Sequence, residues 1–347
     1  MISPLLSHLL IPFIIAIFLA INMGGSGTGP AFSAAYGANI IRKNWIPGLF
    51  GLMVFLGAII AGKGTATTMG KDILPHELMS FPMVSIILFS VSISLLVANL
   101  AGIPQSTSQS TVLAVVAPAI YFSVLNKEKL FFVIIPAWFI LPVIAFIISF
   151  LAGRYIYRPM RRRGLTQSRA QNANLKPIWN GLILVMSLYV AFSIGANNVA
   201  NASGPIASMT ANELNISVDK NFLLIMILST LMIAPNFGIG SSIFGEKILN
   251  NTGKEIVLFG KFEAVIIAFV SASLLLAASL TKGIPTSLVQ LNVAAILGIG
   301  VAKLGPNHIF RKTEVRKFFL MWIIAPTISF TLTFLLTFAA DKMGWLG

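Results

Sequence analysis

Residues 191–202 read AFSIGANNVANA, and residues 20–31 read AINMGGSGTGPA. The two stretches align at an offset of 171 residues, which matches Gly24 with Gly195. Each stretch interrupts a long apolar segment with glycine, hydroxyl and amide groups. A polar break of this kind, present twice in one chain, indicates an internal repeat.

A second pair of motifs repeats the pattern. Residues 102–109 read GIPQSTSQ and residues 283–290 read GIPTSLVQ, at an offset of 181 residues. Five hydrophobic segments separate the repeats, and because five is odd the second copy is expected to enter the membrane in the opposite direction. Inverted repeats with interrupted helices are typical of secondary transporters. A tandem duplication with only a structural role is the alternative, which two separate polar breaks in each half disfavour.

The composition is that of a membrane protein. The 347 residues include 24 Lys and Arg and 10 Asp and Glu, a formal net charge of +14, and 56% are hydrophobic. Only 10% are charged, against about 25% in soluble domains, which argues against a soluble enzyme. The absence of cysteine excludes disulfides, iron–sulfur clusters and thiolate zinc sites. Three scattered histidines make a histidine-rich metal site improbable.

The segments define the expected fold class. The first and sixth are too long for one straight helix, because some 32 residues would extend roughly 48 Å across a hydrocarbon core of about 30 Å. We therefore expect an all-α polytopic membrane protein of two inverted-topology repeats, each of about five membrane segments, with interrupted helices and re-entrant-like hairpins. The hydrophobic segments comprise residues 9–41, 45–62, 80–101, 104–125, 130–152, 178–209, 222–242, 256–281, 285–304 and 318–340.

Basic residues set the expected orientation. When the loop with Arg42 and Lys43 is placed in the cytoplasm, alternation gives that side 16 basic residues and the other side 7, as the positive-inside rule requires. Both termini are then extracytoplasmic, in a multi-pass protein of the plasma membrane. Residues 153–177 hold seven basic residues and no acid, and they are expected to form a cytoplasmic linker between a first repeat at 1–152 and a second at 178–347. Anionic lipid binding is the alternative role for that linker.

The polar breaks predict an anion site. None of them contains Arg, Lys, Asp, Glu or His, and each lies where a half-helix should begin. Helix N-termini present N–H groups and the positive end of the dipole, so they attract anions. Ser and Thr that bond to their own helix, and glycines that serve helix packing, are the alternative for any single break. The residues expected to surround the anion are Ser26, Gly27, Thr28, Ser106, Thr107, Ser108, Asn197, Asn198, Thr286 and Ser287, with Gln109 and Gln290 orienting it or holding the hairpins.

These motifs resemble the inorganic phosphate transporter (PiT) family of secondary transporters over nearly the whole chain. The family signature is Gly-Ala-Asn-Asp-Val-Ala-Asn-Ala in each half, and residues 195–202, GANNVANA, match it with one change. The family's Pro-x-Ser-Thr-Thr/Ser hairpin element matches residues 104–108 and, more weakly, 285–289. Asn197 and Ser26 stand where the family has aspartates implicated in sodium binding. With GIGVAKLGPN at 298–307, the pattern is most similar to the branch of CysP-type sulfate permeases.

The chemistry of the anions agrees with that branch. Phosphate near neutral pH keeps a proton that it can donate to a carboxylate, whereas sulfate can only accept. A site of neutral donors therefore suits sulfate, because a carboxylate facing sulfate would lack a hydrogen bond and be repelled. Phosphate and other oxyanions such as thiosulfate, molybdate and selenate remain alternatives, because they also accept hydrogen bonds from hydroxyls and amides.

Import of a dianion against a negative membrane potential costs roughly 4.6 kcal/mol per 100 mV, so accumulation requires more than two co-transported cations or another energy source. Glu263 lies inside the eighth segment, where an ionisable side chain is a functional candidate, and the resemblance places a family glutamate in a comparable position. It is expected to carry a proton or bind a cation. Pairing with Lys261, or helix capping, is the alternative. Sodium could instead bind neutral ligands near Asn197 and Asn198.

The expected function is secondary active import of sulfate by cation symport, with the proton favoured, through alternating access. Sodium-coupled phosphate transport is the second hypothesis and an anion channel the third. An enzyme is disfavoured, since the spans offer neither a nucleophile–base pair nor a metal cluster. No resident cofactor and no nucleic acid is expected. The lipid bilayer and a homodimer are the expected partners.

Overall fold

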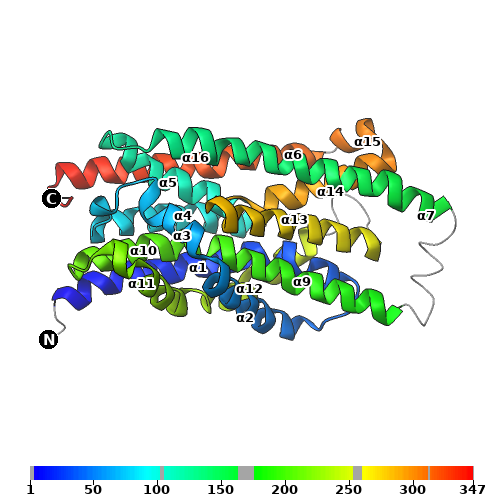
Figure 1. Cartoon of the computed structure of the whole chain (residues 1–347), viewed down its shortest axis with the longest axis horizontal. Helices are drawn as coiled ribbons and strands as arrows, with labels where there is room; N and C mark the ends of the chain where they lie inside the picture. Colours follow the sequence, from blue (N-terminus) through cyan, green and yellow to red (C-terminus); the bar gives the residue numbers. More distant parts are fainter. Residues whose placement is uncertain (1–3, 102–104, 163–175, 253–259, 312, 347) are drawn as a thin grey trace.

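The computed structural model describes residues 4–101, 105–162, 176–252, 260–311 and 313–346, and in these ranges the chain is helical without strands. It confirms the all-α polytopic fold, with at least seven helices long and apolar enough to cross a membrane. Both termini lie at one end of the molecule, and α7 (Arg158–Arg162) and α15 (Pro306–Phe310) lie at the other (Figure 1). The long helices are α1 (Pro4–Gly37), α2 (Ile46–Ala61), α4 (Phe81–Ala101), α5 (Thr107–Tyr121), α6 (Ile135–Leu151), α9 (Lys176–Asn198), α10 (Ala200–Glu213), α11 (Val218–Ile233), α12 (Asn236–Thr252), α13 (Lys261–Lys282), α14 (Leu288–Leu304) and α16 (Thr313–Lys342).

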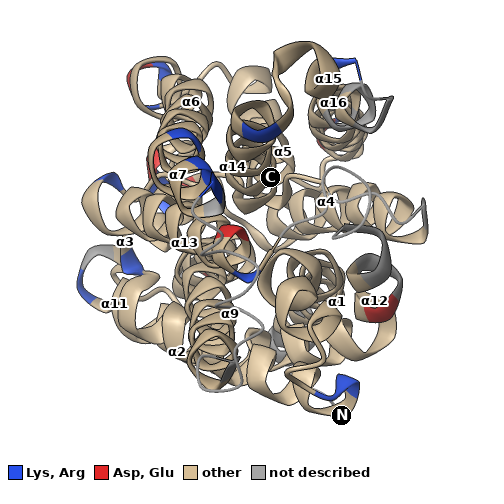
Figure 2. Ribbon diagram, turned by 90° about the vertical axis from the view of Figure 1, so that its right-hand side faces the viewer, with Lys and Arg blue, Asp and Glu red and all other residues tan. Residues whose placement is uncertain are grey.

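The helices form two bundles, seen end-on in Figure 2. The first contains α1, α2, α9, α11 and α12, and the second contains α5, α6, α14 and α16. Packing is reciprocal between the two halves of the chain: α1 packs on α12 as α9 packs on α2, and α5 packs on α16 as α14 packs on α6. Helices α4 and α13 pack against both bundles, on α1 and α16 and on α9 and α6 respectively.

Two hairpins enter from opposite ends. Helices α4 and α5 lie in the half that holds the chain termini, and α13 and α14 lie toward α7 and α15 (Figure 1). The second arms, α5 and α14, have 15 and 17 residues. At 1.5 Å per residue they reach only about 22 and 26 Å, too short for a core of about 30 Å. They therefore begin inside the protein, as the proline-containing motifs before them predict.

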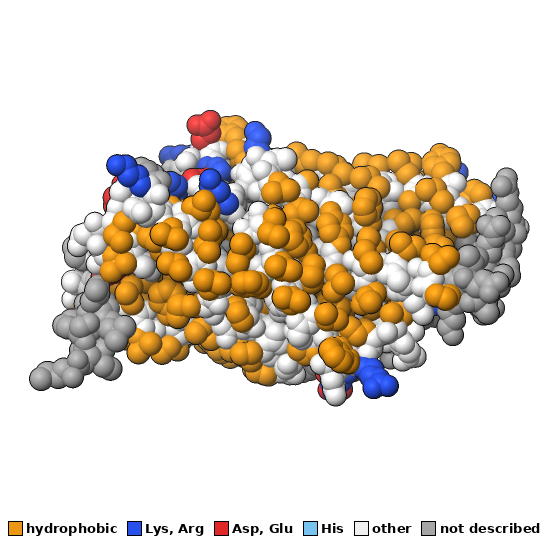
Figure 3. All heavy atoms as spheres, turned by 60° about the horizontal axis from the view of Figure 1, so that its bottom comes forward, with side chains coloured by type: hydrophobic (Ala, Val, Ile, Leu, Met, Phe, Trp, Pro, Cys, Tyr) orange, Lys and Arg blue, Asp and Glu red, His pale blue; other side chains and the backbone are white. Residues whose placement is uncertain are grey.

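The outer surface is that of a protein in lipid. Hydrophobic side chains cover most of the face in Figure 3, and charged side chains gather toward its margins. Phe132, Phe139, Ile60 and Ile323 are each at least 69% exposed, whereas many Ser, Thr and Asn side chains are buried. Apolar surface on this scale requires a hydrocarbon environment.

The predicted interruption of the first segment is wrong. Helix α1 continues through residues 24–29. The glycine at position 24 instead allows a close helix contact, since a Cβ there would lie 2.2 Å from the Phe237 carbonyl oxygen of α12. Gly195 allows an equally close contact, because a Cβ at this position would lie 2.0 Å from the Val54 carbonyl oxygen of α2. The sixth segment is interrupted at a single residue, Val199, whose φ and ψ of −60° and −33° are still helical. The matching glycines thus allow helix packing.

The seventh segment also differs from its prediction. Residues 243–252, expected in a loop, extend α12, and the span is a pair of helices, α11 and α12, bent by 40°. Pro235 lies at the bend, where its ring and missing N–H break the helical hydrogen bonding.

Candidate functional site

Two helix N-termini define the centre of the molecule. Ser106 caps α5 by accepting a hydrogen bond from the Gln109 N–H (3.3 Å), and Ser287 caps α14 by accepting from the Gln290 N–H (3.2 Å). Both caps have extended backbone conformations. The two glutamine side chains bond each other reciprocally, at 3.1 and 2.8 Å. The structure thus gives Gln109 and Gln290 the role of joining the two hairpins.

A small cavity lies between these N-termini and the first bundle. Its volume of about 10 Å³ is room for roughly one water molecule, so its walls must separate before an oxyanion can enter. No lining side chain is charged among the residues that the structure describes. The cavity is lined by Ser26, Gly27 and Pro30 of α1, Asn198 of α9, Gln105 and Thr107 at the start of α5, and Ser287, Leu288 and Val289 at the start of α14.

The first turns of α5 and α14 supply backbone donors at this cavity. Thr107 and Leu288 are the first residues of the two helices, and N–H groups at such positions have no carbonyl of their own helix to bond. The dipoles of both helices place positive potential on the same space. The arrangement attracts a small anion without a charged side chain.

Two buried side chains at the cavity have polar atoms with no hydrogen-bond partner within the described chain. They are Gln105, whose Nε2 and Oε1 are both unpartnered and which is fully buried, and Asn198, whose Oδ1 is unpartnered. Buried polar groups are nearly always bonded, so such groups at a cavity indicate a ligand site. Gln105 was not among the residues selected from sequence. Its position in the first hairpin motif, matching Thr286 at the offset of 181, was the available signal.

Asn197 is fully bonded and joins the hairpins to α9. Its Nδ2 donates to Ser279 Oγ (2.8 Å) and to the Ile284 carbonyl (2.9 Å). Its Oδ1 accepts from Ser108 Oγ and from the Thr286 N–H, both at 3.2 Å. With four bonds, this amide has no free group for an anion.

Predicted site residues therefore fall into two groups. Ser26, Gly27, Thr107, Asn198 and Ser287 line the cavity, and Ser106 caps the helix beside it. The others do not line it in this conformation.

The residues away from the cavity serve the scaffold. Thr28 bonds back to the Gly24 carbonyl (2.7 Å), and its methyl group would lie 3.1 Å from a Cβ at Gly245. Ser108 also accepts from Asn201 Nδ2 (3.3 Å), and sequence reasoning did not select Asn201.

Glu263 is buried and paired with a partner other than the one considered from sequence. Lys303 Nζ lies 2.8 Å from Glu263 Oε1, and the same ammonium lies 5.0 Å from the ring centre of Tyr157. Lys261 instead donates to Asn180 Oδ1, at 2.6 Å. Glu263 does not line the central cavity. Within the described ranges, no group of three or more His, Cys, Asp or Glu could hold a metal ion.

A larger vestibule lies beside the central cavity. It has a volume of about 580 Å³ and shares Pro30 with the cavity. Its walls include the end of α1, at Tyr36 and Asn39, and the start of α13, at Lys261. The vestibule therefore lies where α1 ends and α13 begins.

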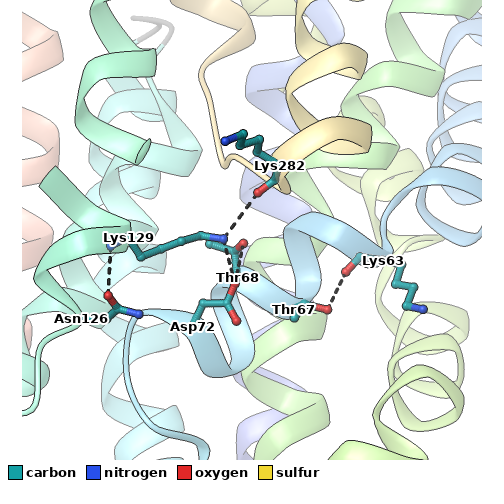
Figure 4. A network of polar contacts seen from close by, with 7 residues as sticks. All are labelled: Lys63, Thr67, Thr68, Asp72, Asn126, Lys129 and Lys282. Atoms are coloured by element: carbon teal, nitrogen blue, oxygen red, sulfur yellow. Dashed lines mark hydrogen bonds and ion pairs between the residues drawn. The ribbon is translucent and has the colours of Figure 1, made fainter. Parts of the chain in front are cut away.

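A further set of polar contacts joins the chain around Asp72 to the segment before α6 and to the end of α13 (Figure 4). Lys129 Nζ pairs with Asp72 Oδ2 at 2.8 Å and lies 3.5 Å from the Lys282 carbonyl, the last residue of α13. Thr68 Oγ1 donates to the same carboxylate at 3.3 Å. Trp138 Nε1 of α6 donates to the Pro285 carbonyl at 2.9 Å. Together these bonds hold the tip of the second hairpin.

Comparisons with known proteins show the family and the fold. The model of the "Phosphate transporter family" matches residues 23–333. The chain is 32% identical to the sulfate permease CysP of Bacillus subtilis, over 92% of this chain and 85% of that protein. It is 24% identical to a "probable low-affinity inorganic phosphate transporter" of the same organism, over 89% of this chain and 90% of that one. A solved structure of a sodium-dependent phosphate transporter superposes with a TM-score of 0.80 at 20% identity, covering 97% of this chain and 99% of the other.

Proposed function

Because this chain belongs to the phosphate transporter family of multi-pass membrane transporters, we propose that it imports sulfate, by cation symport, through the cavity between α5 and α14. One observation carries the proposal: two helix N-termini face one cavity whose described lining side chains are all neutral. Helix N-termini bind oxyanions through N–H groups and the dipole.

The choice of sulfate depends on what surrounds the anion. The two family aspartates are replaced by Ser26, whose hydroxyl donates to the Met23 carbonyl (3.1 Å), and by Asn197, whose amide is fully bonded. Among the residues that the structure describes, no carboxylate lines the cavity to accept the proton that phosphate carries. The likeness to a sulfate permease supports the same choice. Phosphate is the second candidate, because other relatives carry that name.

Alternating access follows from the two bundles. The central cavity lies between them, the vestibule adjoins it beside the start of α13, and the Lys129–Asp72 pair lies beside the other end of that helix, at Lys282. An inverted repeat accounts for the reciprocal packing and for the matching caps at Ser106 and Ser287. With the basic 153–177 linker in the cytoplasm, the vestibule is the cytoplasmic exit, and both termini are extracytoplasmic.

The coupling ion is the proton in this proposal. Glu263 is its candidate carrier, and to be protonated it must release Lys303 in each cycle. The unpartnered Asn198 Oδ1 offers a neutral ligand for sodium instead, as neutral oxygens do in other transporters. Import of a dianion requires more than two positive charges per sulfate to be electrically favourable.

Uptake of labelled sulfate into proteoliposomes tests the proposal, with an imposed proton gradient and, separately, a sodium gradient. The expected result is uptake that is stimulated by the proton gradient and resists excess phosphate. Sodium-driven phosphate uptake would overturn the choice of sulfate and proton. Flux that follows only the sulfate gradient and the voltage would identify a channel.

A further inference from the structure

The vestibule contains one charged lining residue among those that the structure describes, and it is cationic. Lys261 lines a space of about 580 Å³ whose other described walls are apolar or neutral, including Ser187 and Asn292. Pro30 lines both the vestibule and the central cavity, so the two spaces are neighbours.

The position of Lys261 is electrostatically unusual. It is the first residue of α13, so its ammonium adds to the positive end of a 22-residue helix dipole. The N-cap, Gly260, has no side chain to bond the first N–H groups, although it lines the vestibule too. Cations are ordinarily disfavoured at this end of a helix, and anions are favoured.

The nearby acidic residue is paired with a different lysine. Glu263 lies in the same first turn, but its carboxylate is paired with Lys303 at 2.8 Å. The hydrogen-bond partner of Lys261 is the neutral Asn180 Oδ1 at 2.6 Å. Within the described chain no carboxylate pairs with Lys261, so its charge is available to an anion in the vestibule.

We infer that Lys261, positioned by Asn180 and assisted by the first turn of α13, forms a second oxyanion subsite on the exit path. The inference rests on the proposed function, since it takes the same class of ligand, a small inorganic dianion. The subsite holds the anion transiently after it leaves the central cavity and raises its local concentration from the vestibule side. A charge in a cleft acts mainly on association rates, and its effect weakens as salt rises.

The test is the association rate of labelled sulfate with purified protein at low and high ionic strength. Lys261→Gln should lower the rate about 3- to 10-fold at low salt and flatten its salt dependence. Lys261→Arg should retain the wild-type association rate and its salt dependence. Lys43→Gln is the matched control, because Lys43 is exposed and already pairs with Glu246. Unchanged rates and salt dependence in Lys261→Gln, with normal sulfate binding in the wild type, would overturn the subsite alone, whereas a wild type that binds no oxyanion would overturn the proposed function as well.

A second measurement guards against a folding defect. The chain has no cysteine, so Lys261→Cys can be labelled selectively with thiol reagents of similar size and opposite charge. A cationic adduct should restore the association rate, and an anionic adduct should lower it further. Equal rates for the two adducts would overturn the inference.

Discussion

Asn197→Asp tests the account of the central amide. The substitution keeps an oxygen for Ser108 and Thr286 but replaces the Nδ2 donor with a second acceptor. Ser279 can rotate to donate to the new carboxylate, whereas the Ile284 carbonyl loses its 2.9 Å bond and faces negative charge.

The magnitude follows from these contacts. A buried carbonyl left without a donor costs about 1–3 kcal/mol. An uncompensated buried carboxylate adds several more, so the variant should lose roughly 4 kcal/mol of stability. A cation between the carboxylate, Ser279 Oγ and the Ile284 carbonyl would reverse part of this loss, by about 2.7 kcal/mol when its concentration is 100 times its dissociation constant.

The assay is thermal unfolding in detergent at pH 8, in potassium and in sodium chloride of equal ionic strength. The wild type should unfold at the same temperature in both salts, and Asn197→Asp should be destabilised in potassium and regain part of that stability in sodium. Asn221→Asp is the control, since its Nδ2 bonds only the Ser217 carbonyl near the start of α11. A variant as stable as the wild type in potassium would refute the role of the Nδ2 donor.

Three further predictions concern other contacts. Gln109→Leu and Gln290→Leu should each weaken sulfate transport, because each single change leaves the other buried amide unpaired. The double variant should therefore be less impaired than the two single effects combined. Sulfate uptake by the wild type, both single variants and the double variant measures this coupling. Glu263→Gln should abolish proton stimulation of uptake but keep sulfate counterflow, and retained stimulation would exclude Glu263 as the carrier. Asp72→Asn should increase the labelling, from the extracytoplasmic side, of a cysteine introduced at the cavity. The charge-swapped double variant, Asp72→Lys with Lys129→Asp, should return the labelling to the wild-type level. Unchanged labelling in Asp72→Asn would exclude a role of this ion pair in closing the cavity.

Local chemistry in the sequence predicted the hairpins well. Proline followed by Ser and Gln, at the same spacing twice, predicts a helix start with a serine cap, and both caps are present at Ser106 and Ser287. The polar breaks also identified five residues that line the cavity. These features depend on neighbours within a few positions, which the sequence displays directly.

Tertiary contacts decide the rest. The path of α1 through Gly24 depends on α12, more than 200 residues away, whose backbone approaches that glycine closely. The four bonds of Asn197 and the pairing of Glu263 with Lys303 likewise join distant segments. No local pattern distinguishes an amide that binds an anion from one that holds two hairpins together.

The central claim is that backbone N–H groups at the start of α5 and α14 bind the anion. The most direct measurement is the dissociation constant of labelled sulfate for Thr107→Val and Thr107→Pro. Both variants remove the hydroxyl, but only proline removes the N–H, and the first turn of a helix after an extended Ser106 tolerates proline. We expect Thr107→Pro to bind sulfate roughly 10- to 100-fold more weakly than Thr107→Val, because that factor corresponds to the loss of one hydrogen bond to a charged group. Equal affinities in two folded variants would contradict the claim.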